Sequence, residues 1–229
     1  MTGEDLKKAR QQKGWTQVQA AQRLRMTQAY LSMLERGQRG LSDSVLRRAH
    51  QNLSLAPTAL PLPGEPSALP SPNDAVRSEL AALGYPGFSY LQRKPDRNPA
   101  EVLFSALNQS DLDTRVAEGL PWLTLTYADM NWDWLVRHAK VHDRQNRLGF
   151  TVTLAQELAT KVNDTERAAS LEPHLLALRQ SLLAREDTFC HDSMTETERK
   201  WLRQNRPPAA QQWNLLTDLA VEHLAHVLP

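Results

Sequence analysis

The side chains that most often carry out catalysis or bind metals lie in the C-terminal half of the sequence. His138 and His142 are four residues apart, a spacing that puts two imidazoles on one helix face and can bind zinc. Ala139 follows His138, however, where the HExxH zinc motif has glutamate. We therefore interpret the pair as ordinary buried or surface histidines.

Cys190, His191 and Asp192 bring the groups of a nucleophilic site into consecutive positions. Consecutive side chains on one backbone do not converge, and no loop suited to stabilising an oxyanion is apparent nearby. The sequence also lacks the glycine-rich nucleotide motifs and the G-x-S-x-G motif of hydrolases. We predict no catalytic residues, no metal site and no cofactor, and hence a protein that is not an enzyme.

A second group of polar side chains, near the N-terminus, is suited to recognition. Residues 4–53 have apolar positions at helical spacing, interrupted by signals for helix ends. Gly14 is expected to end a first helix, Thr16 to cap a second, and Thr27 to cap a third after a short turn at 25–26. A tight connection between the second and third helices of a small bundle predicts a helix-turn-helix.

The side chains of the second and third helices are expected to divide between core and surface. Val18, Ala21 and Leu24 share one face of the second helix. The residues of the third helix expected to face inward are Tyr30, Leu31 and Leu34, and those expected to point away are Gln28, Ala29, Ser32 and Met33. A fourth helix is expected to begin at a Ser42 cap.

The stretch GWTQVQAAQRLRMTQAYLSMLERGQR, residues 14–39, resembles the Cro/Xre-type helix-turn-helix domains of phage lambda-like repressors. The agreement includes the Thr16-Gln17 start of the second helix, the entry to the third helix and the LERG run at 34–37. Arg25 departs from the pattern, because it stands in the turn where the family usually has glycine, so an unfavourable backbone conformation is expected there. The resemblance implies that residues 1–55 form a lambda-repressor-like DNA-binding domain.

The same resemblance implies a role for each polar residue of this surface. Gln17 would contact a phosphate at the N-terminus of the second helix, and Gln28 would bind adenine through both atoms of its amide. Ser32 would reach a base edge, while Ala29 and Met33 would pack on thymine methyl groups. Contacts to the sugar-phosphate backbone are expected from Arg36, Gln38 and Arg39. The expected partner is palindromic double-stranded DNA, bound by a homodimer.

The distribution of charge agrees with DNA binding by the N-terminal region alone. The 229-residue chain has a net charge of only +1. Residues 1–55 contain ten Lys or Arg and four Asp or Glu, whereas the remainder contains 17 and 22. Because there is no membrane-length apolar stretch, no signal peptide and only one cysteine, we expect a cytoplasmic protein without membrane attachment.

Proline marks the boundary between the two predicted domains. Residues 56–73 contain six of the fourteen prolines, which favour an extended linker. Apolar residues at helical spacing then predict an all-helical domain over 74–229, and the fold class of the whole chain is predicted to be all-α. Within this domain, Pro121 is expected in the first turn of a helix and Gly149 just beyond the end of another.

Several aromatic and basic residues of the second domain form a candidate surface for a protein partner. A helix over 132–147 would align four basic side chains in one stripe, those of Arg137, Lys140, Arg144 and Arg147. Aromatic residues cluster at 122–134 and in the non-helical segment 84–99, where they pack either in their own core or against a partner. The candidate partner-binding residues are Tyr85, Phe88, Tyr90, Trp132, Trp134, Arg137 and Arg144.

The run DMNWDWLVRHAKVHDRQNRLGF, residues 129–150, resembles helix-turn-helix regulators found beside abortive-infection nucleotidyltransferase toxins. This resemblance implies an antitoxin that represses its own operon and neutralises a toxin such as a nucleotidyltransferase through its C-terminal domain. The alternative is a ligand-responsive repressor whose helical domain holds a small-molecule pocket. A change in tryptophan fluorescence and operator affinity on adding a metabolite would favour the alternative.

Overall fold

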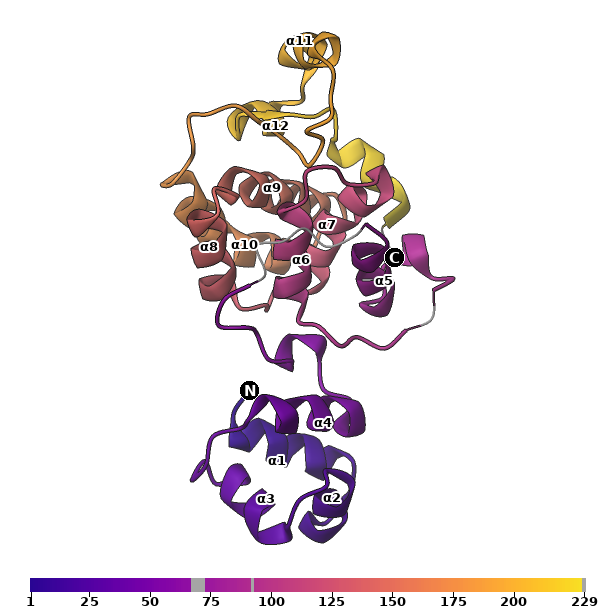
Figure 1. The fold of residues 1–229 in the computed structure, drawn as a ribbon, viewed down its shortest axis with the longest axis vertical. Coiled ribbons are helices and arrows are strands. Elements are labelled where there is room, and N and C mark those ends of the chain that lie inside the picture. Colours follow the sequence, from indigo (N-terminus) through magenta and orange to yellow (C-terminus); the bar gives the residue numbers. More distant parts are fainter. Residues whose placement is uncertain (67–72, 92, 228–229) are drawn as a thin grey trace. The chain divides into compact units, whose positions relative to one another are not determined.

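The structure, a computed structural model, describes residues 1–66, 73–91 and 93–227. It divides into two compact units (Figure 1): the first unit comprises residues 1–62 and 96–98, and the second unit comprises 63–95 and 99–229. Both are built mainly from α-helices, which confirms the predicted all-α class. Residues 67–72 of the expected proline-rich linker lie outside the described residues.

The first unit is the predicted helix-turn-helix. Its helices are α1 (Gly3–Gln12), α2 (Gln17–Arg23), α3 (Gln28–Glu35) and α4 (Asp43–Leu53), followed by the short 3₁₀ turn η1 (Pro57–Ala59). The apolar core joins all four helices through side chains that include Leu6, Ala20, Leu24, Leu31, Leu34 and Val45. Val18 does not share this core and is 55% exposed, because the buried face of α2 is formed by Ala20, Ala21 and Leu24.

Local capping chemistry sets the ends of these helices. The hydroxyls of Thr16 and Thr27 accept hydrogen bonds from the amides of Gln19 and Tyr30, both at 3.2 Å, so both predicted caps are confirmed. Arg25 has φ +55°, the left-handed conformation that favours glycine and that its place in the turn predicted. Ser42 precedes α4, but its side chain makes no capping hydrogen bond.

The end of the first unit is more ordered than an extended linker. Leu60 is buried, and the side-chain amide of Asn98 donates to the carbonyls of Thr58 and Leu60 at 3.0 and 2.8 Å. Arg47 of α4 donates to the carbonyl of Asp96 at 2.9 Å. The chain therefore contributes a second, short segment to the first unit after it has already entered the second.

The second unit is a helical assembly centred on one long helix (Figure 1). Its α-helices are α5 (Asn73–Ala82), α6 (Pro99–Leu107), α7 (Thr114–Thr126), α8 (Trp132–Val141), α9 (Gln145–Lys161), α10 (Thr165–Arg179), α11 (Glu196–Asn205) and α12 (Pro208–Gln212). Two 3₁₀ segments, η2 (Pro86–Phe88) and η3 (Val221–Val227), complete the helical elements. A minimal parallel pair joins β1 (Asp187–Thr188) to β2 (Leu215–Leu216). Among the described residues, no helix is both long and apolar enough to cross a lipid bilayer.

Two helix boundaries predicted from glycine and proline are wrong. Pro121 lies inside α7 rather than in its first turn. Gly149 lies inside α9, where the ring of Trp213 packs directly on it and any Cβ would overlap the ring. The Trp213 indole N–H donates to Thr153 Oγ1 at 2.8 Å, one turn further along α9. Tertiary packing, rather than a turn, therefore explains Gly149.

The predicted basic stripe is also wrong, because the chain turns at Asp143 (φ +56°) between α8 and α9. Arg137 is exposed on α8, whereas Arg147 is 2% exposed inside the second unit. The guanidinium of Arg147 donates to both carboxylate oxygens of Asp187 at 2.9 and 3.1 Å and to Asp192 at 3.2 Å.

The remaining donors of Arg147 tie α9 to the end of α6. Its Nη1 donates to the carbonyls of Leu107 and Gln109 at 3.2 and 2.7 Å. With its carboxylate contacts, these bonds satisfy all the donors of a buried guanidinium, which otherwise carries a large desolvation cost. Arg147 thus fixes the segment 187–192 against the helical core.

Candidate nucleic-acid interface

A chain of hydrogen bonds runs from the core of the first unit to the surface formed by α2 and α3. The guanidinium of Arg10 on α1 donates to both oxygens of Glu35 at 2.6 and 3.0 Å. Glu35 also accepts from the Gln17 amide at 2.9 Å, and the Gln17 carbonyl oxygen accepts from the Gln28 amide at 2.7 Å. The two glutamines predicted to contact DNA are therefore side by side and held by a buried ion pair.

The electrostatics of the ion pair favour its charged form. Burial alone would raise the pKa of Glu35, but hydrogen bonds from Arg10 and Gln17, together with the charge of Arg10, lower it below the usual value. The hydrogen bond to Glu35 likewise raises the pKa of Arg10. Sequence reasoning did not identify this pair, although an arginine on the apolar face of α1 was a signal that a buried carboxylate would be its partner.

The surface of α3 that could enter a DNA groove starts at its N-terminus. Gln28 and Ala29 are exposed, and Met33 is partly exposed one turn further on. Short exposed side chains beside an amide allow close approach to base edges, and the thioether of a methionine suits contact with a thymine methyl group. These three residues point away from the core, as expected.

Ser32 does not point freely away from the core. It is 6% exposed, and its hydroxyl accepts hydrogen bonds from Nε and Nη2 of Arg36 at 3.2 and 2.5 Å. Because Arg36 is four residues further along the chain, its long side chain folds back over the serine. Ser32 can reach a base only after Arg36 moves, whereas Arg36 is already at the surface.

The turn that follows α3 carries the predicted phosphate contacts. Gly37 has φ +69°, and Arg36, Gln38 and Arg39 around it are exposed. Arg36, Gly37 and Gln38 line a hollow that is shared with Gln17 and with Lys7 of α1. Glu4 and Glu35 also line the hollow, and Glu35 is already paired with Arg10. The amide, guanidinium and ammonium groups around it suit a phosphate of a nucleic-acid backbone.

Lys7 is a basic residue of this hollow that was not predicted from the sequence to contact DNA. Its ammonium lies 3.9 Å from the exposed carboxylate of Glu4, a weak pair that does not prevent other contacts. Gly3 also lines the hollow, because the start of α1 meets the end of α3 so closely that a Cβ would overlap the carbonyl of Leu34.

Four of the candidate partner-binding residues are inside the second unit. Tyr85 and Phe88 are 1% exposed and form an edge-on ring pair at 5.2 Å between centroids, while Trp132 and Trp134 are 7% and 6% exposed. The indole N–H groups of Trp132 and Trp134 donate to backbone carbonyls, which explains their inward placement. A partner cannot reach these aromatic rings without opening the unit.

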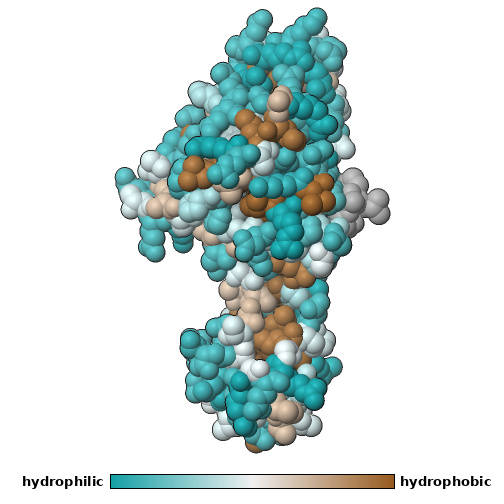
Figure 2. All heavy atoms as spheres, turned by 90° about the vertical axis from the view of Figure 1, so that its left-hand side faces the viewer, coloured by the Kyte–Doolittle hydropathy of each residue, from teal (hydrophilic) through white to brown (hydrophobic). Residues whose placement is uncertain are grey.

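The three other candidates remain accessible to different degrees. Tyr90 is 67% exposed, Arg137 is exposed, and Arg144 is partly buried with its Nε donating to Asn108 at 3.1 Å. Figure 2 shows one face of the molecule, on which hydrophobic side chains form separate patches among hydrophilic ones.

The cysteine and histidines singled out in the sequence do not form a metal site among the described residues. Among residues 1–66, 73–91 and 93–227, no three His, Cys, Asp or Glu side chains are arranged to hold a metal ion. Cys190 is 1% exposed, and burial raises the pKa of its thiol to about 11. His138 is 3% exposed beside Trp134, and neither of its ring nitrogens has a hydrogen-bond partner among the described residues.

Comparison with known proteins matches a part of the first unit. Residues 6–59 match a protein-family model described as Helix-turn-helix, which covers about a quarter of the chain. Neither a curated protein nor a solved structure gives a significant match. The match confirms the helix-turn-helix prediction and identifies these residues as a DNA-binding domain of the kind found in transcription regulators.

Proposed function

We propose that the chain is a sequence-specific transcriptional repressor that reads its operator with the N-terminal end of α3. The observation that carries this proposal is the 2.7 Å hydrogen bond between Gln17 and Gln28. It joins an amide at the start of α2 to one at the start of α3, so that one can bind a phosphate while the other binds a base edge. Glu35 holds Gln17 in turn and thereby limits the orientations of both amides.

The remaining contacts follow from this orientation of α3. Ala29 and Met33 pack on bases beside the one bound by Gln28, and Arg36, Gln38 and Arg39 bind the sugar-phosphate backbone. These contacts give one domain a small interface, and a dimer on a two-fold operator doubles both its area and its specificity. We therefore propose that a homodimer binds two half-sites about 10 base pairs apart.

The direct test is footprinting of the purified chain on DNA upstream of its own gene, with the mass of the complex measured by light scattering. Two protected half-sites about one helical turn apart, and two chains per duplex, are expected. A complex with one chain per duplex would refute the proposal that a homodimer binds. Protection that does not depend on the DNA sequence would refute sequence-specific recognition.

We also propose a protein partner for the second unit, and that the chain acts as the antitoxin of a module that represses its own operon. This proposal rests on the resemblance of residues 129–150 to regulators found beside nucleotidyltransferase toxins. The test is coexpression with the product of the adjacent gene, followed by co-purification and by rescue of growth. If neither complex formation nor rescue occurs, the antitoxin role is wrong.

A specific observation supports a second role, that of a ligand-responsive repressor. The second unit contains a cavity of about 450 Å³ lined by α7, α11 and the segments around residues 190 and 218. This volume is within the range of about 300–1,000 Å³ that is usual for small-molecule sites. A ligand of this cavity that changed operator affinity would distinguish this role from that of an antitoxin.

A further inference from the structure

The cavity of about 450 Å³, one of those in the second unit, combines apolar side chains with an exposed indole. Leu112, Phe189, Leu202, Leu216 and Leu219 line it, and Trp201 of α11 borders it. Trp201 is 55% exposed, whereas its neighbour Leu202 is the buried residue of this helix. A large indole that borders a cavity and adds little to the core is a common feature of ligand sites.

The charged side chains that line the cavity are acidic. They are the carboxylates of Glu118, Glu198 and Asp218; His191 and His223 also line the cavity, and its lining contains no Lys or Arg. This bias is local, since the whole chain has 27 Lys and Arg against 26 Asp and Glu. An anion would be repelled by the three carboxylates, while a cation would be attracted.

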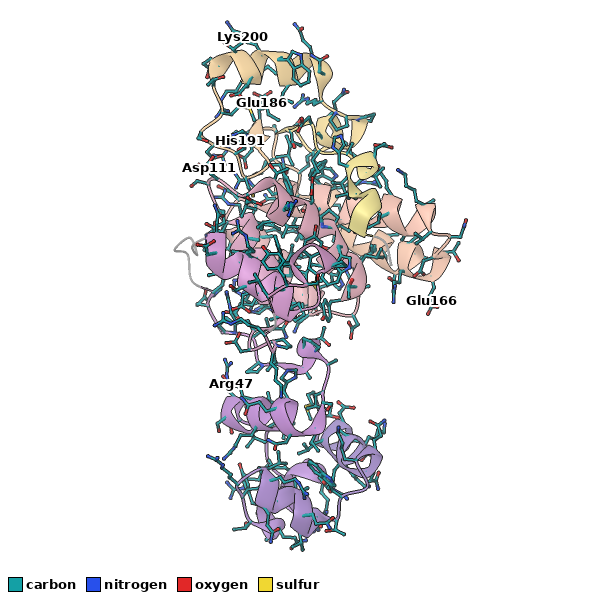
Figure 3. The ribbon with its side chains drawn as sticks, turned by 90° about the vertical axis from the view of Figure 1, so that its right-hand side faces the viewer. Arg47, Asp111, Glu166, Glu186, His191 and Lys200 are labelled. Atoms are coloured by element: carbon teal, nitrogen blue, oxygen red, sulfur yellow. The ribbon has the colours of Figure 1, made fainter. Side chains whose placement is uncertain are left out.

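The basic residues of α11 are not among the residues that line the cavity. Arg203 binds Glu186 with a shortest distance of 2.8 Å, and Arg199 donates to the carbonyl of Asp192 at 3.0 Å. Figure 3 shows Lys200 on the side of α11 opposite to His191. The guanidinium groups of Arg199 and Arg203 therefore have partners other than the three carboxylates of the cavity.

The walls of the cavity are positioned by the core of the unit. Arg147 holds the segment 187–192 through Asp187 and Asp192, and so fixes Phe189 and His191 at one side. Met194, Leu202 and Leu216 form a small apolar cluster that seats α11 on the opposite side. The cavity is thus built by packing and by a buried ion pair.

We propose that this cavity binds a small organic cation, an amine or guanidinium attached to an aromatic or alkyl body. The apolar body contacts Leu216 and Leu219, and the cationic end lies between the face of Trp201 and the carboxylate of Asp218. Tryptophan is the most favourable aromatic side chain for a cation, and it acts together with the carboxylate here. The inference deepens the ligand-responsive role, but the binding step concerns the second unit and requires no DNA.

The test uses calorimetric titration of the full-length chain with three probes that share one body. Phenethylamine is the cation, 2-phenylethanol is the neutral probe and 3-phenylpropanoate is the anion. Phenethylamine is expected to bind at least about fivefold more tightly than the alcohol, as a cation–π contact and one exposed ion pair together predict. Equal affinity for amine and alcohol, or no binding of the amine at millimolar concentration, overturns the proposal.

Matched variants locate the binding site. Asp218→Asn is expected to weaken phenethylamine binding by about two- to fivefold, the size of an exposed ion pair, and to leave the alcohol unchanged. Glu166→Gln removes an exposed carboxylate from α10, on the other side of the second unit in Figure 3, and is expected to have no effect. If the two variants weaken the amine equally, the cavity is not the site.

Trp201 provides a second, independent test of the chemistry. Trp201→Phe is expected to retain the preference for amine over alcohol, whereas Trp201→Leu is expected to lose about half or more of it while the chain stays folded. A preference unchanged in Trp201→Leu contradicts the role of the indole.

A fourth probe separates a free cation from the side chain of a protein. The probe is a Phe-Lys dipeptide that is acetylated and amidated at its ends, and the proposal expects it to bind more weakly than phenethylamine. A dipeptide bound tenfold more tightly than phenethylamine would assign the cavity to a protein partner and overturn the small-molecule proposal. Operator binding is measured separately on the same samples, so failure of the DNA-binding proposal leaves the result of this test unaffected.

Discussion

Replacing Arg10 by methionine tests whether the buried ion pair between Arg10 and Glu35 supports the surface of α2 and α3 that is proposed to contact DNA. In the structure, Arg10 gives two donors to Glu35 and a third to the carbonyl of Trp15 at 2.8 Å, and the Glu35 side chain is 2% exposed. Arg10→Met keeps an unbranched side chain but leaves a buried carboxylate with Gln17 alone. Removing one partner from a buried pair costs about 3–5 kcal/mol.

This cost is large in relation to the size of the first unit. The unit has 65 residues, for which a free energy of unfolding of about 3–10 kcal/mol is typical. Arg10→Met is therefore expected to remove a large part of the free energy of unfolding of the first unit, and operator binding is expected to fall with it.

Hydrogen exchange read by mass spectrometry resolves this effect, because peptides from the second unit serve as an internal control. Amides of α1 to α3 are expected to lose most of their protection in Arg10→Met, while those of α9 are unchanged. The double variant Arg10→Met, Glu35→Leu removes both charges and is expected to recover most of the protection. If the free energy of opening derived from exchange in the single variant stays within about 1 kcal/mol of the wild-type value, the ion pair does not have the proposed importance.

Three further predictions follow from the structure. Gly149→Ala is expected to destabilise the second unit by about 1–3 kcal/mol in urea unfolding, because the added Cβ overlaps Trp213. In the control variant Gly40→Ala the added Cβ meets no atom within 4 Å, so little change in stability is expected. Folding lowers the pKa of Glu35, so the ionised carboxylate contributes fully to stability above the pKa of glutamate in the unfolded chain, about 4.3, and this contribution is lost as the pH falls through the lower pKa of the folded state. Acid titration of the first unit followed by circular dichroism should show this loss of stability. A loss that instead begins near neutral pH would contradict the prediction. Burial and a thiol pKa of about 11 make Cys190 unreactive toward a thiol reagent in the native chain, so that modification should require denaturant, and rapid native labelling would show that the thiol is accessible.

The features that could be predicted from the sequence are those set by local chemistry. Thr16 and Thr27 cap their helices because each hydroxyl accepts a hydrogen bond from the backbone amide three residues later. This interaction does not depend on residues elsewhere in the fold. The left-handed conformation of Arg25 agrees with the expectation from the family resemblance, since glycine is usual at this position of the turn. The order of the helices and the exposure of Gln28 and Ala29 follow from these local signals.

The features that could not be predicted depend on contacts between distant residues. Gly149 had the local signature of a helix end but lies inside α9, and only the position of Trp213 explains why glycine is needed there. Arg147 belonged to a basic run that is usually solvated, but two aspartates far along the chain make its burial possible. Ser32 was assigned to the surface because helical periodicity does not show that Arg36 folds over it.

The placement of the aromatic residues of the second unit could not be predicted from the sequence either. Composition alone indicates that Tyr85, Phe88, Trp132 and Trp134 belong either to a core or to an interface, and their burial decides for the core. The cavity bordered by Trp201 had no sequence signature, since its lining comes from four separated segments.

The most direct test of the central claim compares two variants on the cognate operator over a range of salt concentrations. Gln28→Ala is expected to cost about 1–3 kcal/mol of binding free energy on the cognate sequence and to relax the preference at one base pair. Arg39→Ala is expected to weaken all sequences alike and to reduce the salt dependence by about one unit of log slope. If Gln28→Ala instead weakened binding to all DNA sequences equally, or if Arg39→Ala changed the base preference, the N-terminal end of α3 would not be the part of the domain that contacts the bases.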